Sequence, residues 1–161
     1  MIIKATSLGD SPTRELAAKR FASLGLPMDR VELLGPAATQ EEHLATYARI
    51  DVALDTFPYN GTTTTCEALA MGVPVVSLYG AHHASRVGLS ILSAAGFPQW
   101  ATDNPKRFLQ AACGVADQAA SYRHTLRDRL RSSTLCDGRG IARKIESAYR
   151  TAWKTWCGSQ E

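Results

Sequence analysis

The sequence lacks the features that would place it in a membrane or around a metal. No uninterrupted apolar segment reaches the roughly 20 residues of a transmembrane helix, and no basic stretch leads into a long apolar run at the N-terminus. The four cysteines, at positions 66, 113, 136 and 157, form no Cys-x-x-Cys pair, so they predict neither a zinc site nor a disulfide framework. We therefore expect reduced thiols, a cytoplasmic location and no membrane partner.

The charge gives no sign of a nucleic-acid surface. The 161 residues carry a formal charge of +3, and 45% of them are hydrophobic, which is ordinary for a globular protein of one domain. Basic residues are scattered, apart from a cluster between Arg123 and Arg131 that also contains Asp128. Such mixed charge is typical of the solvated face of a helix. We expect no nucleic-acid partner.

Short apolar runs alternate with longer amphipathic segments along the chain. We expect strands at residues 1–5, 31–34, 50–55, 74–78 and 99–102, with helices at 13–24, 39–49, 63–71 and 84–95. This alternation is typical of βαβ units and predicts an α/β fold with a parallel sheet flanked by helices. Residues 1–161 are expected to form one domain, with 104–161 a helical extension that packs on it. Its last helix, 141–156, should dock on the core through an apolar stripe: Ile145, Tyr149, Ala152, Trp153 and Trp156.

The segment from Asp55 to Glu67 carries the clearest chemical signal. It leads from an expected strand, through Asn60 and Gly61, into a helix whose start holds the four threonines 62–65. The first amides of a helix have no partner within it, and the helix dipole adds positive charge there, so a phosphate can bind. Gly61 would let a ligand approach the backbone. The alternative interpretation is that Thr62 is an ordinary N-cap and its neighbours fill space.

Three further side chains follow expected strands at the same edge. Glu67, one turn into the threonine helix, could accept two hydrogen bonds from a ribose or could simply face solvent. His43 could stack on a base or contact a phosphate, although a lone histidine is more often structural. Arg86 stands near a helix start, where binding an anion or a carboxylate would explain its charge. The chain offers no metal-ligand spacing and no nucleophile–base pair, so we expect no metal, no cofactor and no catalytic residue.

With these residues in view, the chain resembles the C-terminal catalytic lobe of the O-GlcNAc transferase family, which includes the plant SPINDLY-type enzymes and bacterial relatives with tetratricopeptide repeats. The resemblance covers roughly residues 1–155. It rests on Arg30–Leu34, on Glu41-Glu-His43, on Ala84-Ser-Arg-Val87 and above all on the long motif from Asp51 to Val76. It implies a GT-B architecture, in which two Rossmann-like lobes face a cleft and the C-terminal lobe holds a nucleotide-sugar.

The resemblance also implies roles for the site residues. His43 would contact the base, Thr62, Thr63 and Thr64 would hold the diphosphate, and Glu67 would bind the ribose. The set of donor-binding residues expected on both grounds is His43, Asn60, Gly61, Thr62, Thr63, Thr64, Thr65, Glu67 and Arg86. Family members are inverting transferases that modify serine or threonine hydroxyls of proteins.

The resemblance leaves the donor open. Thr62-Thr-Thr64 is closer to the SPINDLY type, which uses GDP-fucose, whereas Ala84-Ser-Arg-Val87 is nearer the animal form, which uses UDP-GlcNAc. Compared with the family, the chain begins after the lobe's first strand and helix and lacks the N-terminal lobe and the repeats that hold the acceptor protein. We therefore expect the isolated chain to be inactive. A nucleotide-sugar epimerase and a non-catalytic α/β interaction module remain the alternatives.

Overall fold

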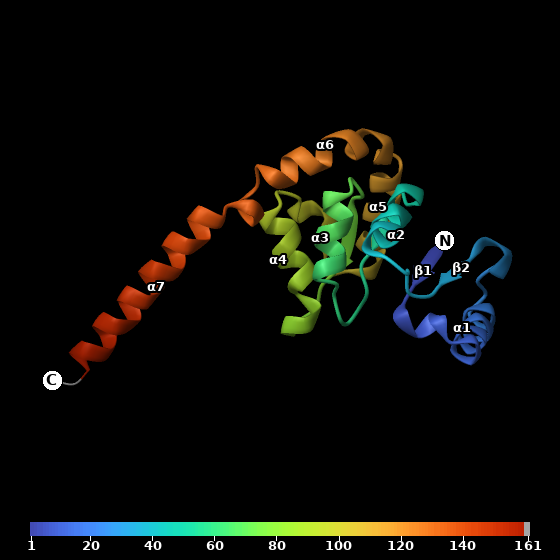
Figure 1. Cartoon of the computed structure of the whole chain (residues 1–161), viewed down its shortest axis with the longest axis horizontal. Coiled ribbons are helices and arrows are strands. Elements are labelled where there is room, and N and C mark those ends of the chain that lie inside the picture. Colours follow the sequence, from blue (N-terminus) through green and yellow to red (C-terminus); the bar gives the residue numbers. More distant parts are fainter. Residues whose placement is uncertain (160–161) are drawn as a thin grey trace. The chain divides into compact units, whose positions relative to one another are not determined.

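The computed structural model describes residues 1–159, which form two compact units (Figure 1). Unit 1 comprises Met1–Ile50 and unit 2 begins at Asp51. The sequence alone gave no sign of this division, because the boundary falls inside an apolar run rather than in a glycine- or proline-rich linker. All strands pair in parallel, as the alternation predicts, but in two separate sheets.

Unit 1 is built on a single βαβ crossover. Strand β1 (Ile2–Lys4) pairs with β2 (Glu32–Leu34), with Ile3 opposite Leu33, and helix α1 (Ser11–Ser23) lies between them in the chain. Helix α2 (Gln40–Ala45) follows β2 and continues as a 3-10 turn, Thr46–Arg49. The expected helix at 39–49 is therefore present, although its second half is more tightly wound.

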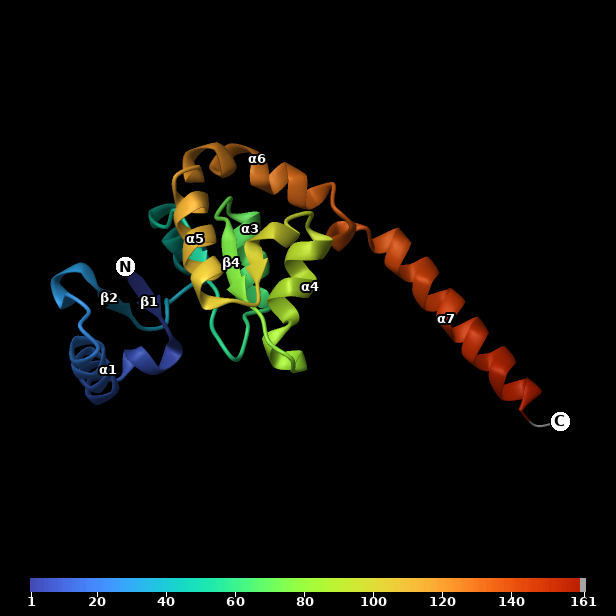
Figure 2. The ribbon, with the colours of Figure 1, turned by 180° about the vertical axis from the view of Figure 1, so that it is seen from behind.

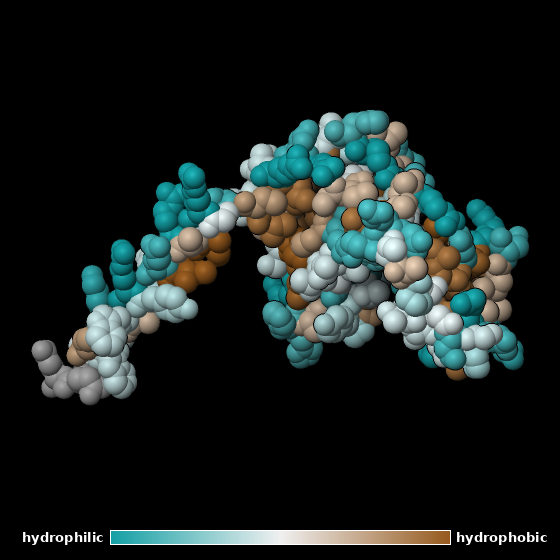
Figure 3. Space-filling model, in the orientation of Figure 1, coloured by the Kyte–Doolittle hydropathy of each residue, from teal (hydrophilic) through white to brown (hydrophobic). Residues whose placement is uncertain are grey.

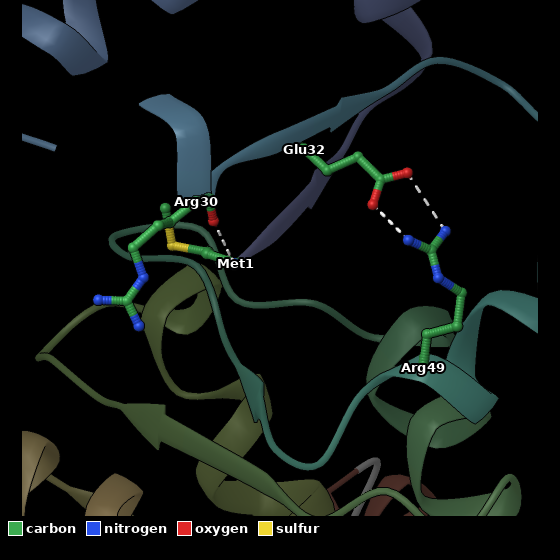
Figure 4. A network of polar contacts seen from close by, with 4 residues as sticks. All are labelled: Met1, Arg30, Glu32 and Arg49. Atoms are coloured by element: carbon green, nitrogen blue, oxygen red, sulfur yellow. Dashed lines mark hydrogen bonds and ion pairs between the residues drawn. The ribbon is translucent and has the colours of Figure 1, made fainter. Parts of the chain in front are cut away.

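Unit 1 has little buried apolar surface, and polar contacts close its edges. Leu8 and Tyr47 are its buried hydrophobic residues. The Met1 amino group donates to the carbonyl of Arg30 at 2.6 Å (Figure 4). The two terminal guanidinium nitrogens of Arg49, Nη1 and Nη2, pair with the carboxylate of Glu32. The ion pair is exposed, so it contributes little to stability.

Unit 2 contains the larger core, built around a buried strand. Strands β3 (Ala53–Leu54), β4 (Val75–Leu78) and β5 (Ala101–Thr102) lie in the order β3-β4-β5. Ala53 stands opposite Val75, and Ser77 stands opposite Ala101. The first three residues of β4 are buried, as expected of a central strand covered on both faces.

Helices cover both faces of this sheet. Helix α3 (Thr63–Ala70) lies on one face and α5 (Pro105–Ala116) on the other, as the two opposite views show (Figures 1 and 2). Helix α4 (Val87–Ala94) packs beside β4 and β5, and α6 (Ala119–Arg131) packs against α3. The fully buried side chains come from several of these elements and include Leu69, Leu92, Phe97 and Leu126.

The C-terminal end of α3 is anchored on α6 through Gly72. This glycine has φ of +78°, a conformation that other residues rarely adopt. A Cβ atom at this position would lie 2.7 Å from the carbonyl oxygen of Arg123, so the two backbones meet directly. Gly72 therefore ends α3 and also forms a packing contact with α6.

The last helix corrects one of our expectations. Helix α7 (Gly138–Gly158) is present, but its apolar stripe does not dock on the core of unit 2: Tyr149 is 73% exposed and Trp153 is 66% exposed. Hydrophobic surface is visible on α7 in Figure 3. Leu126 and Leu130 of the preceding helix α6 are buried in the core instead. Helices α5 and α6, which precede α7, pack against β4 and α3 respectively.

The structure also bears on how the chain meets a membrane. Among the described residues, no helix combines the length and the apolar character needed to cross a bilayer.

Candidate functional site

The site predicted from sequence lies where β3 and β4 end and α3 begins. Asp55 directly follows β3, and its carboxylate organises the loop that leads to α3. Its Oδ1 accepts from the amide of Gly61 at 2.7 Å and from the amide of Thr56 at 2.9 Å, while Oδ2 accepts from the Ser77 hydroxyl at 2.6 Å. The loop is therefore tied at both its ends to one side chain.

Asn60 lies inside this loop and is buried, with 1% of its surface exposed. Its side-chain amide nitrogen donates to the carbonyls of Thr56 (2.8 Å) and Leu78 (3.2 Å), and its Oδ1 accepts from the amide of Gly88 (3.2 Å). The polar atoms of the side chain are thus engaged within the protein. In this structure Asn60 holds backbone together rather than presenting a side chain to a ligand.

The threonines at the start of α3 point in two directions. Thr62, Thr63 and Thr64 are exposed, whereas Thr65 is buried and its hydroxyl donates to the carbonyl of Gly61 at 3.1 Å. One turn of helix separates Gly61 from Thr65, so this bond closes the turn from within. The Thr65 side chain faces the interior; the first three threonines carry the accessible hydroxyls.

The start of α3 has no side-chain cap. The side chain of Thr62, in the N-cap position, accepts no hydrogen bond from the helix, and the first turn contains no acidic residue. The first bond within the helix runs from the amide of Cys66 to the carbonyl of Thr62. The amides before Cys66 therefore receive no partner from the helix itself and lie on its electropositive end.

Glu67 and Cys66 stand one turn further along α3. Glu67 is half-buried and is engaged in an interaction of its own. Burial raises the pKa of the Cys66 thiol, with smaller contributions in the same direction from the charges of Cys136 and Glu67. All four cysteines are free thiols. The raised pKa favours the uncharged thiol, so Cys66 is a poor nucleophile at neutral pH.

Arg86 occupies the N-cap position of α4 and is exposed. Its Nη1 donates to the carbonyl of Gly80 at 3.1 Å, and its guanidinium lies 5.6 Å from the centre of the Tyr79 ring. These contacts hold the arginine beside the end of β4. A shallow hollow of about 470 Å³ adjoins it, lined by His83, Arg86, Val87, Leu89, Ser90 and Ile91. The hollow lies along α4 and does not include the threonines of α3.

His43 belongs to unit 1, where it lies on α2. Its Nδ1 is 2.8 Å from Nζ of Lys4, and its ring meets that of Tyr47 edge-on at 5.8 Å. A charged lysine can only donate, so Lys4 donates and Nδ1 of His43 accepts in this contact. The ring is half-buried. Its role in binding a base stays a prediction.

The structure brings in three residues that our sequence reasoning missed: Asp55, Ser77 and Gly88. A signal was present for two of them, because Asp55 closes an apolar run and Ser77 interrupts another. A polar residue such as Ser77, buried in a strand, needs a partner. Gly88 could not have been found, since only the fold places it beside Ser77 and Asp55. Among residues 1–159, no group of histidine, cysteine or acidic side chains could hold a metal ion.

Comparison with known proteins decides the family. The model of glycosyl transferase family 41 matches residues 8–143. The chain belongs to this family. This confirms the resemblance to the O-GlcNAc transferases and SPINDLY-type enzymes that the motif from Asp51 to Val76 indicates.

Individual members of family 41 match along nearly the whole chain. A protein of Solanum lycopersicum, named "probable UDP-N-acetylglucosamine–peptide N-acetylglucosaminyltransferase SPINDLY", is 38% identical over 160 residues, 98% of this chain and 17% of its own length. The UDP-N-acetylglucosamine–peptide N-acetylglucosaminyltransferase of Caenorhabditis elegans is 30% identical over 151 residues, 92% of this chain and 13% of its own length. The chain thus spans less than a fifth of these relatives.

A solved structure of the same family confirms the fold. A mutant O-GlcNAc transferase of Thermobaculum terrenum superposes with a TM-score of 0.89 and is 37% identical; the match covers 99% of this chain and 31% of that one. The fold is that of the C-terminal lobe of a GT-B glycosyltransferase.

Proposed function

We propose that the chain is the donor-binding lobe of an inverting protein O-glycosyltransferase and that the start of α3 binds the diphosphate of a nucleotide-sugar. One observation carries this proposal: the helix start is exposed and uncapped at the edge where β3 and β4 end. In open parallel sheets, ligands bind beyond the carboxyl ends of the strands. A pyrophosphate there would accept from helix amides and from the hydroxyls of Thr62 and Thr63.

This geometry suits departure of a nucleoside diphosphate. When an acceptor hydroxyl attacks the anomeric carbon, the bond to the diphosphate breaks and negative charge grows on the leaving oxygen. Amides fixed at the positive end of α3 stabilise that charge without having to reorient. They accelerate the reaction only insofar as they bind the departing group more tightly than the intact donor.

The remaining residues are assigned by the family resemblance together with their places in the structure. Glu67, one turn from the threonines, binds the ribose through its carboxylate. Arg86 lies at the start of the next helix and adds positive charge at the same edge of unit 2. His43 contacts the base. The chain binds the donor but contributes no catalytic base, so we expect it to bind nucleotide and transfer no sugar by itself.

The names of the relatives favour UDP-GlcNAc as the first donor to test. The tomato and nematode proteins are both named for UDP-N-acetylglucosamine and for peptide acceptors. Three threonines at positions 62–64 keep GDP-fucose as the second donor, because they follow the SPINDLY pattern. The acceptor is a serine or threonine hydroxyl of a protein. The free cysteines are consistent with a reducing, cytoplasmic environment.

A titration tests the proposal directly. UDP, GDP, UDP-GlcNAc and GDP-fucose are added in turn to the labelled chain while backbone amide chemical shifts are followed. We expect saturable shifts centred on residues 62–67 for one of the two bases. Shifts for no nucleotide would contradict the proposal and favour the non-catalytic interaction module.

Replacing Thr63 by alanine measures one contact of the site. The loss of one hydrogen bond should weaken nucleotide binding by about 1 kcal/mol, or roughly fivefold. Thr125→Ala is the matched control, since Thr125 is also an exposed helical threonine of unit 2 but lies on α6. Equal affinities for the two variants would remove Thr63 from the site.

A further inference from the structure

The loop before α3 is held by the side chains of Asp55, which is half-buried, and Asn60, which is buried. Asp55 binds the two amides at the ends of the loop, Gly61 and Thr56, and is joined to β4 through Ser77. Asn60 binds two carbonyls, one in the loop and one at the end of β4. Together they fix where Gly61 lies and hence the direction in which α3 begins.

Asn60 also connects this loop to the start of α4. Its side-chain Oδ1 accepts from the backbone amide of Gly88, in the first turn of α4. Its backbone amide donates to the carbonyl of Ala84 at 2.8 Å. An N-cap residue normally supplies such an acceptor from its own helix. Here Asn60 supplies it from 28 residues away, so the starts of α3 and α4 are held in one network.

The residues of this network are closely packed around Gly61 and Gly88. A Cβ atom at Gly61 would lie 2.6 Å from Thr64 Oγ1, and one at Gly88 would overlap the Ser77 hydroxyl and Asp55 Oδ2. These positions therefore exclude any side chain without a shift of their neighbours.

We infer that Asp55 and Asn60 are positioning residues for the diphosphate, acting through the loop rather than by contact. The inference rests on the proposed function of α3. A carboxylate close to a diphosphate repels it, so the contribution of Asp55 comes from its hydrogen bonds and not from its charge. Asparagine at position 55 keeps an oxygen for the two amides and a polar partner for Ser77, while removing the repulsion.

The test compares variants of the full chain by titration with UDP and GDP. We expect Asp55→Ala and Asn60→Ala to weaken binding at least tenfold and to shift the amide signals of residues 62–64. Asp55→Asn should bind within about threefold of the wild type, or more tightly. Ser77→Ala removes one hydrogen bond only and should weaken binding relative to the wild type, but by less than tenfold. This comparison with the wild type remains decisive if the alanine variant at position 55 does not fold.

A control separates positioning from general stability. Val115→Ala trims a buried side chain of α5 outside the network and should lower the unfolding temperature without changing affinity. If Val115→Ala weakens binding as much as Asp55→Ala, or if Asp55→Ala and Asn60→Ala bind like the wild type, the positioning role is wrong and the proposed function stands. If the wild-type chain binds neither nucleotide, the proposed function fails and the inference falls with it.

Discussion

Helices α2 and α3 both begin after a strand and a short loop with a threonine at the N-cap, yet one start is closed and the other open. At α2, Thr39 Oγ1 accepts from the amide of Glu42 at 3.1 Å, and Glu42 Oε2 accepts from the amide of Ala38 at 3.0 Å. Two acidic residues also face the dipole. At α3 the threonine caps nothing and no acid is present.

The difference teaches how the same residue type serves two purposes. The arrangement at α2 resembles a capping box, except that Glu42 bonds the amide of Ala38, one residue before the N-cap, rather than that of Thr39. Helices α1, α5 and α7 also begin with a capping side chain: Asp10, Asn104 and Asp137. Helices α3, α4 and α6 begin without a side-chain cap. At α3, hydrogen bonds to Asp55 hold the loop that leads into the helix. When the preceding loop stabilises the start of a helix, the first amides of that helix can remain available to a ligand.

Copying the closed start onto α3 should have the largest effect. Thr63→Glu places a carboxylate in the first turn, where the dipole favours it by about 0.3–1 kcal/mol, so the unfolding temperature should hold or rise. The same charge would repel a diphosphate, and we expect nucleotide affinity to fall about a hundredfold. Calorimetric titration measures this, with Thr63→Gln as the neutral control. Equal affinity of the two variants would mean that no anion binds there.

Filling the space at Gly88 should destabilise unit 2, whereas the same substitution at Gly114 of α5 should not. In Gly88→Ala the added methyl group would overlap Ser77 and Asp55, so we expect unit 2 to lose about 1–3 kcal/mol of stability. Gly114→Ala is the control, because a Cβ atom there meets no neighbour within 4 Å. As α5 is a helix, that change should be stabilising. Chemical denaturation compares them, and similar destabilisation by both would contradict the tight fit around Gly88.

Removing the two N-cap threonines tests the comparison itself. Thr39→Ala deletes the cap of α2 and should lower the stability of unit 1 by about 1 kcal/mol. Thr62→Ala deletes no such bond and should change stability by less than about 0.5 kcal/mol. Amide hydrogen exchange in α2 and α3 reports each helix separately. A loss of protection in α3 equal to that in α2 would show that Thr62 does cap its helix.

The smallest expected effect concerns the thiol of Cys66, behind the open start of α3. Burial raises its pKa, so folded Cys66 keeps its proton when an exposed thiol has begun to lose it. As pH rises past the ordinary thiol pKa, the unfolded chain releases a proton that the folded chain retains, and stability falls slightly. We expect iodoacetamide to label Cys66 more slowly than Cys113 or Cys157, as mass spectrometry would detect; equal rates would contradict this.

Much of the fold was predictable because it depends on local pattern. Alternating apolar runs give the parallel strands, and Gly25 and Gly72 end α1 and α3 with positive φ, as expected of glycines in these places. The loop motif from Asp55 to Glu67 was found because its composition is unusual for a helix start. Local pattern also accounts for the cap of α2, since Thr39 and Glu42 lie three residues apart at its start.

The rest depends on contacts that sequence spacing cannot reveal. Asn60 was expected at the ligand, but its burial directs its side chain to three backbone groups. The stripe on α7 predicted docking because periodicity identifies an apolar face without saying whether the fold offers a surface to meet it. The division at Ile50 was missed for the same reason, as it reflects where packing thins rather than where composition changes.

The direct meeting of Gly72 with the backbone of Arg123 has one more consequence. This contact holds the C-terminal end of α3 against α6. The hydrogen bonds of Asp55 and Asn60 hold the loop at its N-terminal end. Because α3 is held at both ends, the direction of its axis is set when the chain folds. Binding of an anion therefore needs little further ordering of the helix. Binding of that anion should then carry only a small entropic cost. Substitutions far from both ends of α3 should leave the affinity unchanged.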